Sequence, residues 1–142
     1  MRIYFAGIGK LKEEIKYTDN DRFNEAIINA LREVGHEVVE DVRDLKRFEK
    51  DVKHCSAFAF EATGTSTYLG YIVCSGELLG IPEYAFYDKT QERKVSFMLL
   101  GNPYVKKLPY VTDGDIRHLV NEIQPPQIRV IEQRRMDNKW VQ

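Results

Sequence analysis

The chain has little cysteine, little net charge and no long apolar run, and each shortage excludes a class of protein. Only two cysteines occur, Cys55 and Cys74, in apolar surroundings and without a CxxC pair, so we expect buried thiols rather than a disulfide. The formal net charge of -1 gives no general reason to expect nucleic acid binding. No apolar run approaches the roughly 18 residues of a membrane span, and the N-terminus has too few apolar residues for a signal peptide. We therefore expect a cytoplasmic protein that binds neither nucleic acid nor a membrane.

Several motifs that mark common catalytic and cofactor sites are also missing. The turn after the first apolar run, Gly7-Ile8-Gly9-Lys10, lacks the full GxGxxG spacing of a dinucleotide site. Ser66 does not lie in the GxSxG elbow of a serine hydrolase. None of the three histidines has another histidine, a cysteine or a carboxylate at metal-ligand spacing. We therefore expect neither a metal nor a cofactor.

The residues that are present alternate between β-rich runs and helical patterns, over a length of 142 residues that suits one domain. The expected strands lie at residues 2–6, 36–42, 57–61 and 83–87. This alternation predicts an α/β fold, a Rossmann-like (flavodoxin-like) three-layer sandwich with a parallel sheet of about five strands. We expect the domain to span residues 1–124. In the remaining segment, 125–142, we expect residues 127–131 to add an edge strand and the rest to be a mobile tail or an oligomer contact.

The most informative stretch is a strand–loop–helix–strand unit at residues 57–88. Ligands of such units sit at the carboxyl ends of the strands, which places them at the polar loop 62–67. Hydroxyls and free N–H groups at a helix N-terminus suit an anion, so Gly64, Thr65 and Ser66 are candidates for holding phosphate. The alternative is a plain turn whose hydroxyls only cap the helix.

Three further positions have a functional and a structural interpretation. Tyr4 lies in the first strand and is either a core residue or part of a site. Glu61 ends the third strand at the edge where active sites gather, so it is either a catalytic carboxylate or an acceptor for loop N–H groups. The pair Lys106-Lys107 is interpreted as a solvated face.

Short motifs along the chain also occur in a characteristic order. They are Met1-Arg2-Ile3-Tyr4-Phe5-Ala6-Gly7, Gly35-His36-Glu37-Val38-Val39, Glu61-Ala62-Thr63 followed by Ser66 and Gly70-Tyr71, Leu79-Gly80-Ile81-Pro82, and Ser96-Phe97-Met98-Leu99-Leu100-Gly101-Asn102-Pro103. Over residues 1–123 this order resembles the nucleoside 2-deoxyribosyltransferase family, and most of all its 2′-deoxynucleoside 5′-phosphate N-hydrolase branch.

The resemblance implies a Rossmann-like fold, a homodimer and cleavage of the N-glycosidic bond of a nucleoside or its 5′-monophosphate. Members attack the anomeric carbon of the sugar with a carboxylate and then pass the sugar to water or another base. By position, Tyr4 would touch the nucleophile or the sugar. Ser96 would reach the phosphate in the neighbouring subunit's site, with Met98 beside it. The other positions implied to bind substrate or phosphate are Gly7, Ile8, Gly9, Gly64, Thr65, Ser66, Gly70, Ile72 and Asn102.

The chain departs from the family where the chemistry should lie. In an ungapped alignment the family's glutamate nucleophile falls on Ile72, which cannot attack a sugar. Ser56 replaces the aspartate that the family carries before the third strand, and Val42 replaces a histidine of the hydrolases. The family's phosphate loop is reduced to Ile8-Gly9-Lys10, without its arginine.

Other residues are candidates for the missing group. Asp41 and Glu61 end strands at the same sheet edge and are the better carboxylates. Tyr68 lies four residues before Ile72 on the same helix face, so it is a candidate nucleophile with Glu61 as its base, and a gapped alignment puts it at the nucleophile's place. Glu77 lies about 140° away and is interpreted as solvated. Three hypotheses stay open: an N-glycosidase or transferase, an inactive nucleotide-binding homologue, and a dimeric α/β protein without a small ligand.

Overall fold

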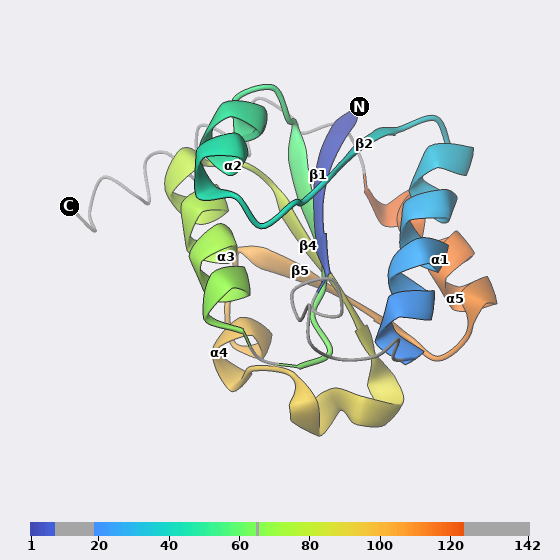
Figure 1. Cartoon of the computed structure of the whole chain (residues 1–142). Helices are drawn as coiled ribbons and strands as arrows, with labels where there is room; N and C mark the ends of the chain where they lie inside the picture. The colour runs from blue at the N-terminus through green and yellow to red at the C-terminus, as the bar shows by residue number, and fades with distance from the viewer. Residues whose placement is uncertain (8–18, 65, 124–142) are drawn as a thin grey trace.

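The computed structural model describes residues 1–7, 19–64 and 66–123, and its centre is a five-stranded, all-parallel sheet (Figure 1). The strands are β1 (Arg2–Gly7), β2 (Glu37–Glu40), β3 (Ala57–Glu61), β4 (Glu83–Asp88) and β5 (Val105–Tyr110). Their order is β2-β1-β3-β4-β5, and every neighbouring pair is parallel. The predicted fold class is therefore confirmed.

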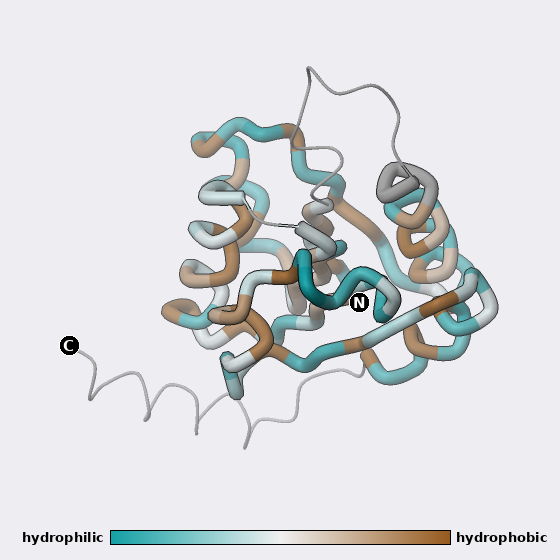
Figure 2. The backbone as a smooth tube through the Cα atoms, turned by 90° about the horizontal axis from the view of Figure 1, so that it is seen from below, coloured by the Kyte–Doolittle hydropathy of each residue, from teal (hydrophilic) through white to brown (hydrophobic). Residues whose placement is uncertain are grey.

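Helices cover both faces of this sheet, which gives the three layers seen in Figure 1 and, from below, in Figure 2. One face carries α1 (Asp19–Glu33) and α5 (Asp113–Leu119), followed by the short turn η3 (Val120–Glu122). The other face carries α2 (Leu45–Val52) and α3 (Thr67–Leu79). Between β4 and β5 the chain forms η2 (Lys89–Lys94) and α4 (Phe97–Leu100). None of the described helices is long and apolar enough to cross a membrane.

The strand residues alternate between two apolar cores. Tyr4 and Phe58 point into the core under α2 and α3. Ile3 and Ala59 point into the core under α1 and α5. Because successive side chains of a strand face opposite sides of the sheet, this alternation decides which helix layer each residue at the carboxyl ends of the strands will meet.

The strand order also fixes where a ligand site is expected. The chain passes from β1 to β2 on one side of β1 and then returns to β3 on its other side. Ligands of open α/β sheets bind at such a reversal, outside the carboxyl ends of the strands. The carboxyl ends of β1 and β3 are Gly7 and Glu61, which are partners in the register of the two strands.

The fifth strand differs from the sequence-based expectation. β5 was not predicted from the sequence, because Lys106, Lys107 and Pro109 interrupt the apolar pattern of a strand. Proline is nevertheless tolerated in an edge strand. Lys106 is exposed, as the interpretation of a solvated face expects, whereas Lys107 is half-buried. Lys106 pairs with Glu122 at 2.7 Å, and the half-buried Lys107 donates to the carbonyl of Asn102. The expected strand at 127–131 and the tail lie outside the described residues.

Candidate functional site

Two tyrosine hydroxyls converge on one carboxylate at the carboxyl edge of the sheet. Asp41 follows β2, and its N–H donates to the carbonyl of Phe5 at 2.9 Å, which fixes it beside β1. Its Oδ1 accepts hydrogen bonds from the hydroxyl of Tyr4 in β1 and from the hydroxyl of Tyr68 in α3, the latter at 2.8 Å. Its Oδ2 is buried, and none of the described residues donates to it. The structure thus joins three predicted site residues into one cluster.

The surroundings of the two phenols favour their neutral form. Burial raises the pKa of Tyr4 above its usual value, and the hydrogen bond to Asp41 raises it further. Burial and the same carboxylate also raise the pKa of Tyr68. A phenol held neutral is a hydrogen-bond donor rather than a nucleophile. Tyr68 is therefore better suited to holding Asp41 than to attacking a sugar.

Arg43, two residues after Asp41, has a strained backbone and carries a positive charge. Arg43 adopts a left-handed backbone conformation, with φ of 59°, which is uncommon for a non-glycine residue and is concentrated at functional sites. Against the larger effect of burial, the positive charge of Arg43 acts to lower the pKa of Tyr68. The next residue, Asp44, caps α2 through the N–H groups of Lys46 and Arg47. Arg43 was not among the residues selected from sequence, because nothing in a sequence pattern marks a left-handed arginine.

Glu61, the other candidate carboxylate, lies on the opposite face of the sheet. It is fully buried, and its Oε1 accepts from the N–H of Thr63 at 3.2 Å, from the hydroxyl of Thr63, and from the hydroxyl of Tyr110 at 3.1 Å. Burial raises its pKa to about 7. The prediction that Glu61 is the base for Tyr68 was wrong, because Tyr68 donates to Asp41 instead. The hydrogen bond from Thr63 matches the alternative prediction of an acceptor for loop N–H groups.

A cavity of about 600 Å³ runs along α3 on the side that faces α4. It is lined by residues from the β3–α3 loop, from α3 and from the segment around α4. Six of them were predicted to bind substrate or phosphate: Gly64, Ser66, Gly70, Ser96, Met98 and Asn102. Its volume is typical of a small-molecule site. The structure therefore brings these six residues together around one space.

The chemistry of the cavity is polar at both ends. Ser66 accepts from the N–H of Leu69 at 3.3 Å and caps α3, whose other first-turn N–H groups lack acceptors within the helix. At the far end Asn102 donates to the carboxylate of Glu77 at 3.2 Å. Glu77, which was interpreted as a solvated residue, is partly exposed and is the one charged residue among the described residues that line the cavity. None of the described lining residues is cationic, so at the Ser66 end the helix N-terminus is what the lining offers to an anion.

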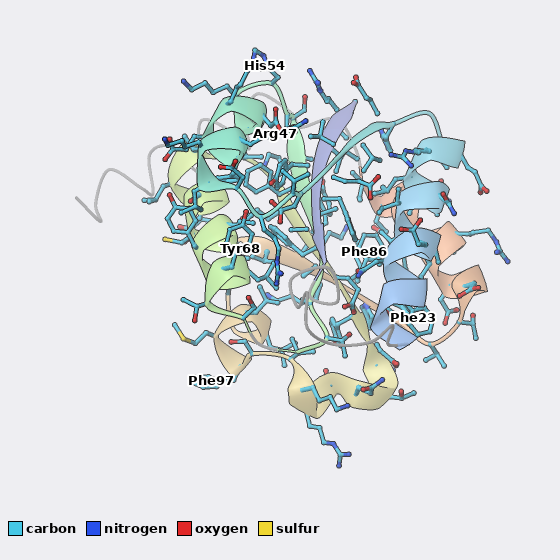
Figure 3. All side chains as sticks on the ribbon, viewed as in Figure 1. Phe23, Arg47, His54, Tyr68, Phe86 and Phe97 are labelled. Carbon is cyan, nitrogen blue, oxygen red and sulfur yellow. The ribbon has the colours of Figure 1, made fainter. Side chains whose placement is uncertain are left out.

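The cavity and the Asp41 cluster lie on opposite sides of α3. Nine residues separate Tyr68 from Glu77, which corresponds to two and a half helical turns, or roughly 180°. In Figure 3, Tyr68 points from α3 toward the middle of the fold, where Asp41 accepts its hydroxyl. Among the described residues the two places come together at the start of α3, where Ser66 and Thr67 line the cavity and the next residue, Tyr68, donates to Asp41. A single ligand therefore reaches both the cavity and Asp41 only by lying across the N-terminus of α3.

Ile72 occupies neither place. It is fully buried in the core with Tyr4 and Phe58, and it is not among the residues that line the cavity. The expectation that Ile72 contacts a substrate was therefore wrong. An apolar side chain suits this place in the core, and position 72 offers no carboxylate.

Gly7 ends β1 directly beneath α1. A Cβ at this position would lie 2.2 Å from Oδ1 of Asn24, so only glycine allows α1 to approach this closely. Asn24 is fully buried, and neither atom of its amide has a partner among the described residues. The remaining predicted residues at this edge, Ile8, Gly9 and Thr65, lie outside the described residues.

Exposed apolar side chains occur on α4 and on α3. Phe97 is 83% exposed and projects away from the fold, as Figure 3 shows, and its neighbour Met98 is 73% exposed. Tyr71, Leu78 and Leu79 on α3 are also exposed, but they line a separate groove between α3 and α2. Large exposed apolar groups that lie close together commonly mark an interaction surface.

Among the described residues, no group of three or more histidine, cysteine or acidic side chains forms a place for a metal ion. Neither a family model nor a curated protein matches the sequence at a significant level.

Proposed function

We propose that this protein binds a nucleoside or its 5′-monophosphate at the carboxyl edge of the sheet and cleaves the N-glycosidic bond with Asp41. The observation that carries this proposal is the convergence of Tyr4 and Tyr68 on one carboxylate oxygen. The motifs that resemble the deoxyribosyltransferases place a tyrosine of the first strand against the nucleophile. Here the carboxylate that accepts a hydrogen bond from this tyrosine is that of Asp41. We therefore propose that Asp41 replaces the glutamate nucleophile, whose aligned position is occupied by Ile72.

The proposed chemistry follows the two-step route of retaining glycosidases. Oδ2 of Asp41 forms a bond to the anomeric carbon while the bond from that carbon to the base nitrogen breaks. The bonding electrons leave with the base, which takes a proton from water. A second water molecule then attacks the sugar ester, releases the sugar and returns the carboxylate. Throughout, Tyr4 and Tyr68 hold Oδ1 and leave Oδ2 as the reacting atom.

The start of α3 is the best place for the 5′-phosphate. Gly64 and Ser66 precede this helix, and its N-terminus is shared by the cavity and the Asp41 cluster. A helix N-terminus attracts anions through its free N–H groups and its dipole. Arg43, near Tyr68, supplies a positive charge close to the cluster. It compensates for the arginine that the phosphate loop lacks.

We also propose that the protein is a homodimer that buries the exposed apolar residues of α4. Phe97 and Met98 are adjacent on this short helix, and both are strongly exposed. In such a dimer, Ser96 and Met98 of one subunit would lie close to the α3 N-terminus of the other.

A second candidate is a nucleotide-binding protein that does not cleave its ligand. The burial of Ile72 and of Oδ2 of Asp41 favours it, because a nucleophile must reach the sugar. In this case the cavity along α3 would hold the nucleotide, on the side of the helix away from Asp41.

Base release separates the two candidates. The wild-type protein is incubated with a panel of deoxynucleosides and their 5′-monophosphates, and free base is measured by chromatography. The first candidate predicts release by the wild type and at least 100-fold slower release by Asp41→Asn. Asp44→Asn is the matched control, because asparagine caps a helix as well as aspartate does. Nucleotide binding without release by the wild type would support the second candidate instead.

A further inference from the structure

Glu61 connects the carboxyl ends of three strands through hydrogen bonds on the α1 face of the sheet. Its Oε1 accepts from Tyr110 at the end of β5 and from the N–H and hydroxyl of Thr63, just after β3. The hydroxyl oxygen of Thr63 accepts in turn from the N–H of Asp88, at the end of β4, at 2.8 Å. One buried carboxylate oxygen therefore holds the turn that leads from β3 to the start of α3.

The other oxygen of Glu61 is arranged differently. Oε2 is buried, and none of the described residues forms a hydrogen bond with it. Because all the donors meet at Oε1, the proton of a neutral Glu61 belongs on Oε2. Two titratable groups of the described residues face this carboxyl, Tyr110 from β5 and Asp88 from the end of β4. Asp88 is itself buried, and its carboxylate accepts from Thr90 and Gln91.

We propose that Glu61 is a positioning residue whose protonation controls how firmly the turn of residues 61–64 is held. An ionised acceptor forms shorter and stronger hydrogen bonds than a neutral one. When Glu61 is charged, the N–H and hydroxyl of Thr63 bind it tightly, which fixes Gly64 and the Ser66 cap of α3. When Glu61 is neutral, the same bonds weaken and the turn loosens.

The turn is well placed to transmit this change. Gly64 has φ of 137°, a conformation that L side chains rarely adopt, and it directly follows Thr63. Burial raises the pKa of Glu61 to about 7, which lies within the range in which cellular pH varies. This inference concerns the protein without a ligand, so it does not depend on nucleotide cleavage.

NMR on the full chain tests the proposal. The ¹³C shift of the Glu61 carboxyl and the amide proton shift of Thr63 are followed from pH 5 to pH 9. Hydrogen exchange of the Thr63 amide is expressed relative to that of Phe5 in β1, which reports global unfolding. We expect the two shifts to titrate with one midpoint, and the relative protection of Thr63 to rise several-fold above it.

Two variants distinguish positioning from a merely structural role. Glu61→Gln keeps the shape of the side chain and should abolish the titration of the Thr63 amide. Glu122→Gln changes an exposed carboxylate on the same side of the sheet and should leave the titration of the Thr63 amide unchanged. The proposal is overturned by an unchanged Thr63 titration in Glu61→Gln. If that variant does not fold, different midpoints for Glu61 and Thr63 in the wild type overturn it.

Discussion

At the scale of single residues, two carboxylates at the sheet edge differ in their hydrogen-bond partners. Asp41 is held by two phenols on one face of the sheet. Glu61 is held by a threonine and a third phenol on the other face. Sequence reasoning selected both carboxylates from their places at strand ends. It did not show that they face different layers, because this depends on the alternation of side chains and on the exact residue at which each strand ends.

The first prediction concerns the two tyrosines of the Asp41 cluster. Replacing either Tyr4 or Tyr68 by phenylalanine removes one donor to Oδ1 and should lower the free energy of unfolding by about 1 kcal/mol. The double variant should lose more stability than the sum of the two single losses, because Asp41 then has no hydrogen-bond donor among the described residues. Urea denaturation measures each value, with Tyr71→Phe, an exposed ring on the same helix, as the control. Strictly additive losses would show that the two phenols do not act on one acceptor.

The second prediction concerns the pH dependence of stability. Burial raises the pKa of Glu61 from 4.5 to about 7, so between these values the folded chain binds more protons than the unfolded chain. Stability should therefore fall as pH rises through this window, by about 3 kcal/mol in all. Thermal or urea unfolding of Glu61→Gln should lack this fall. A variant that loses stability with pH as steeply as the wild type would contradict the assignment.

At the scale of elements, close packing of α1 on β1 determines the shape of the sheet edge. Most helices and strands could be predicted from periodicity, because their apolar residues alternate or recur at helical spacing. β5 could not, because its lysines and proline suit an exposed edge and suppress the apolar pattern. The cavity along α3 could not be predicted either, since it depends on how the segment around α4 folds back against that helix.

The third prediction uses two glycines with different surroundings. Gly7→Ala places a Cβ against the buried Asn24 and should destabilise the fold by about 1–3 kcal/mol. Gly70→Ala is the control, because no atom lies within 4 Å of its Cβ position and alanine favours a helix. It should leave stability unchanged or raise it by up to about 1 kcal/mol. Equal effects of the two substitutions on the unfolding midpoint would argue against close packing at Gly7.

At the scale of the whole molecule, the exposed Phe97 and Met98 of α4 predict self-association. Sedimentation should show a dimer for the wild type and a monomer for Phe97→Glu, because the charge is placed in the apolar interface. Val111→Glu changes an exposed valine after β5 and should remain dimeric. A wild-type monomer at tens of micromolar, or a dimeric Phe97→Glu, would remove the basis for assigning Ser96 and Met98 to a neighbouring site.

The central claim is that Asp41 faces the anomeric carbon of a bound nucleotide. A crystal of the protein soaked with a deoxynucleoside 5′-monophosphate tests it most directly. We predict the phosphate at the N-terminus of α3 and the anomeric carbon roughly 3–3.5 Å from Oδ2 of Asp41, the distance of a reactive geometry. A nucleotide that lies in the cavity between Gly70 and Glu77, with its sugar on the far side of α3 from Asp41, would contradict it.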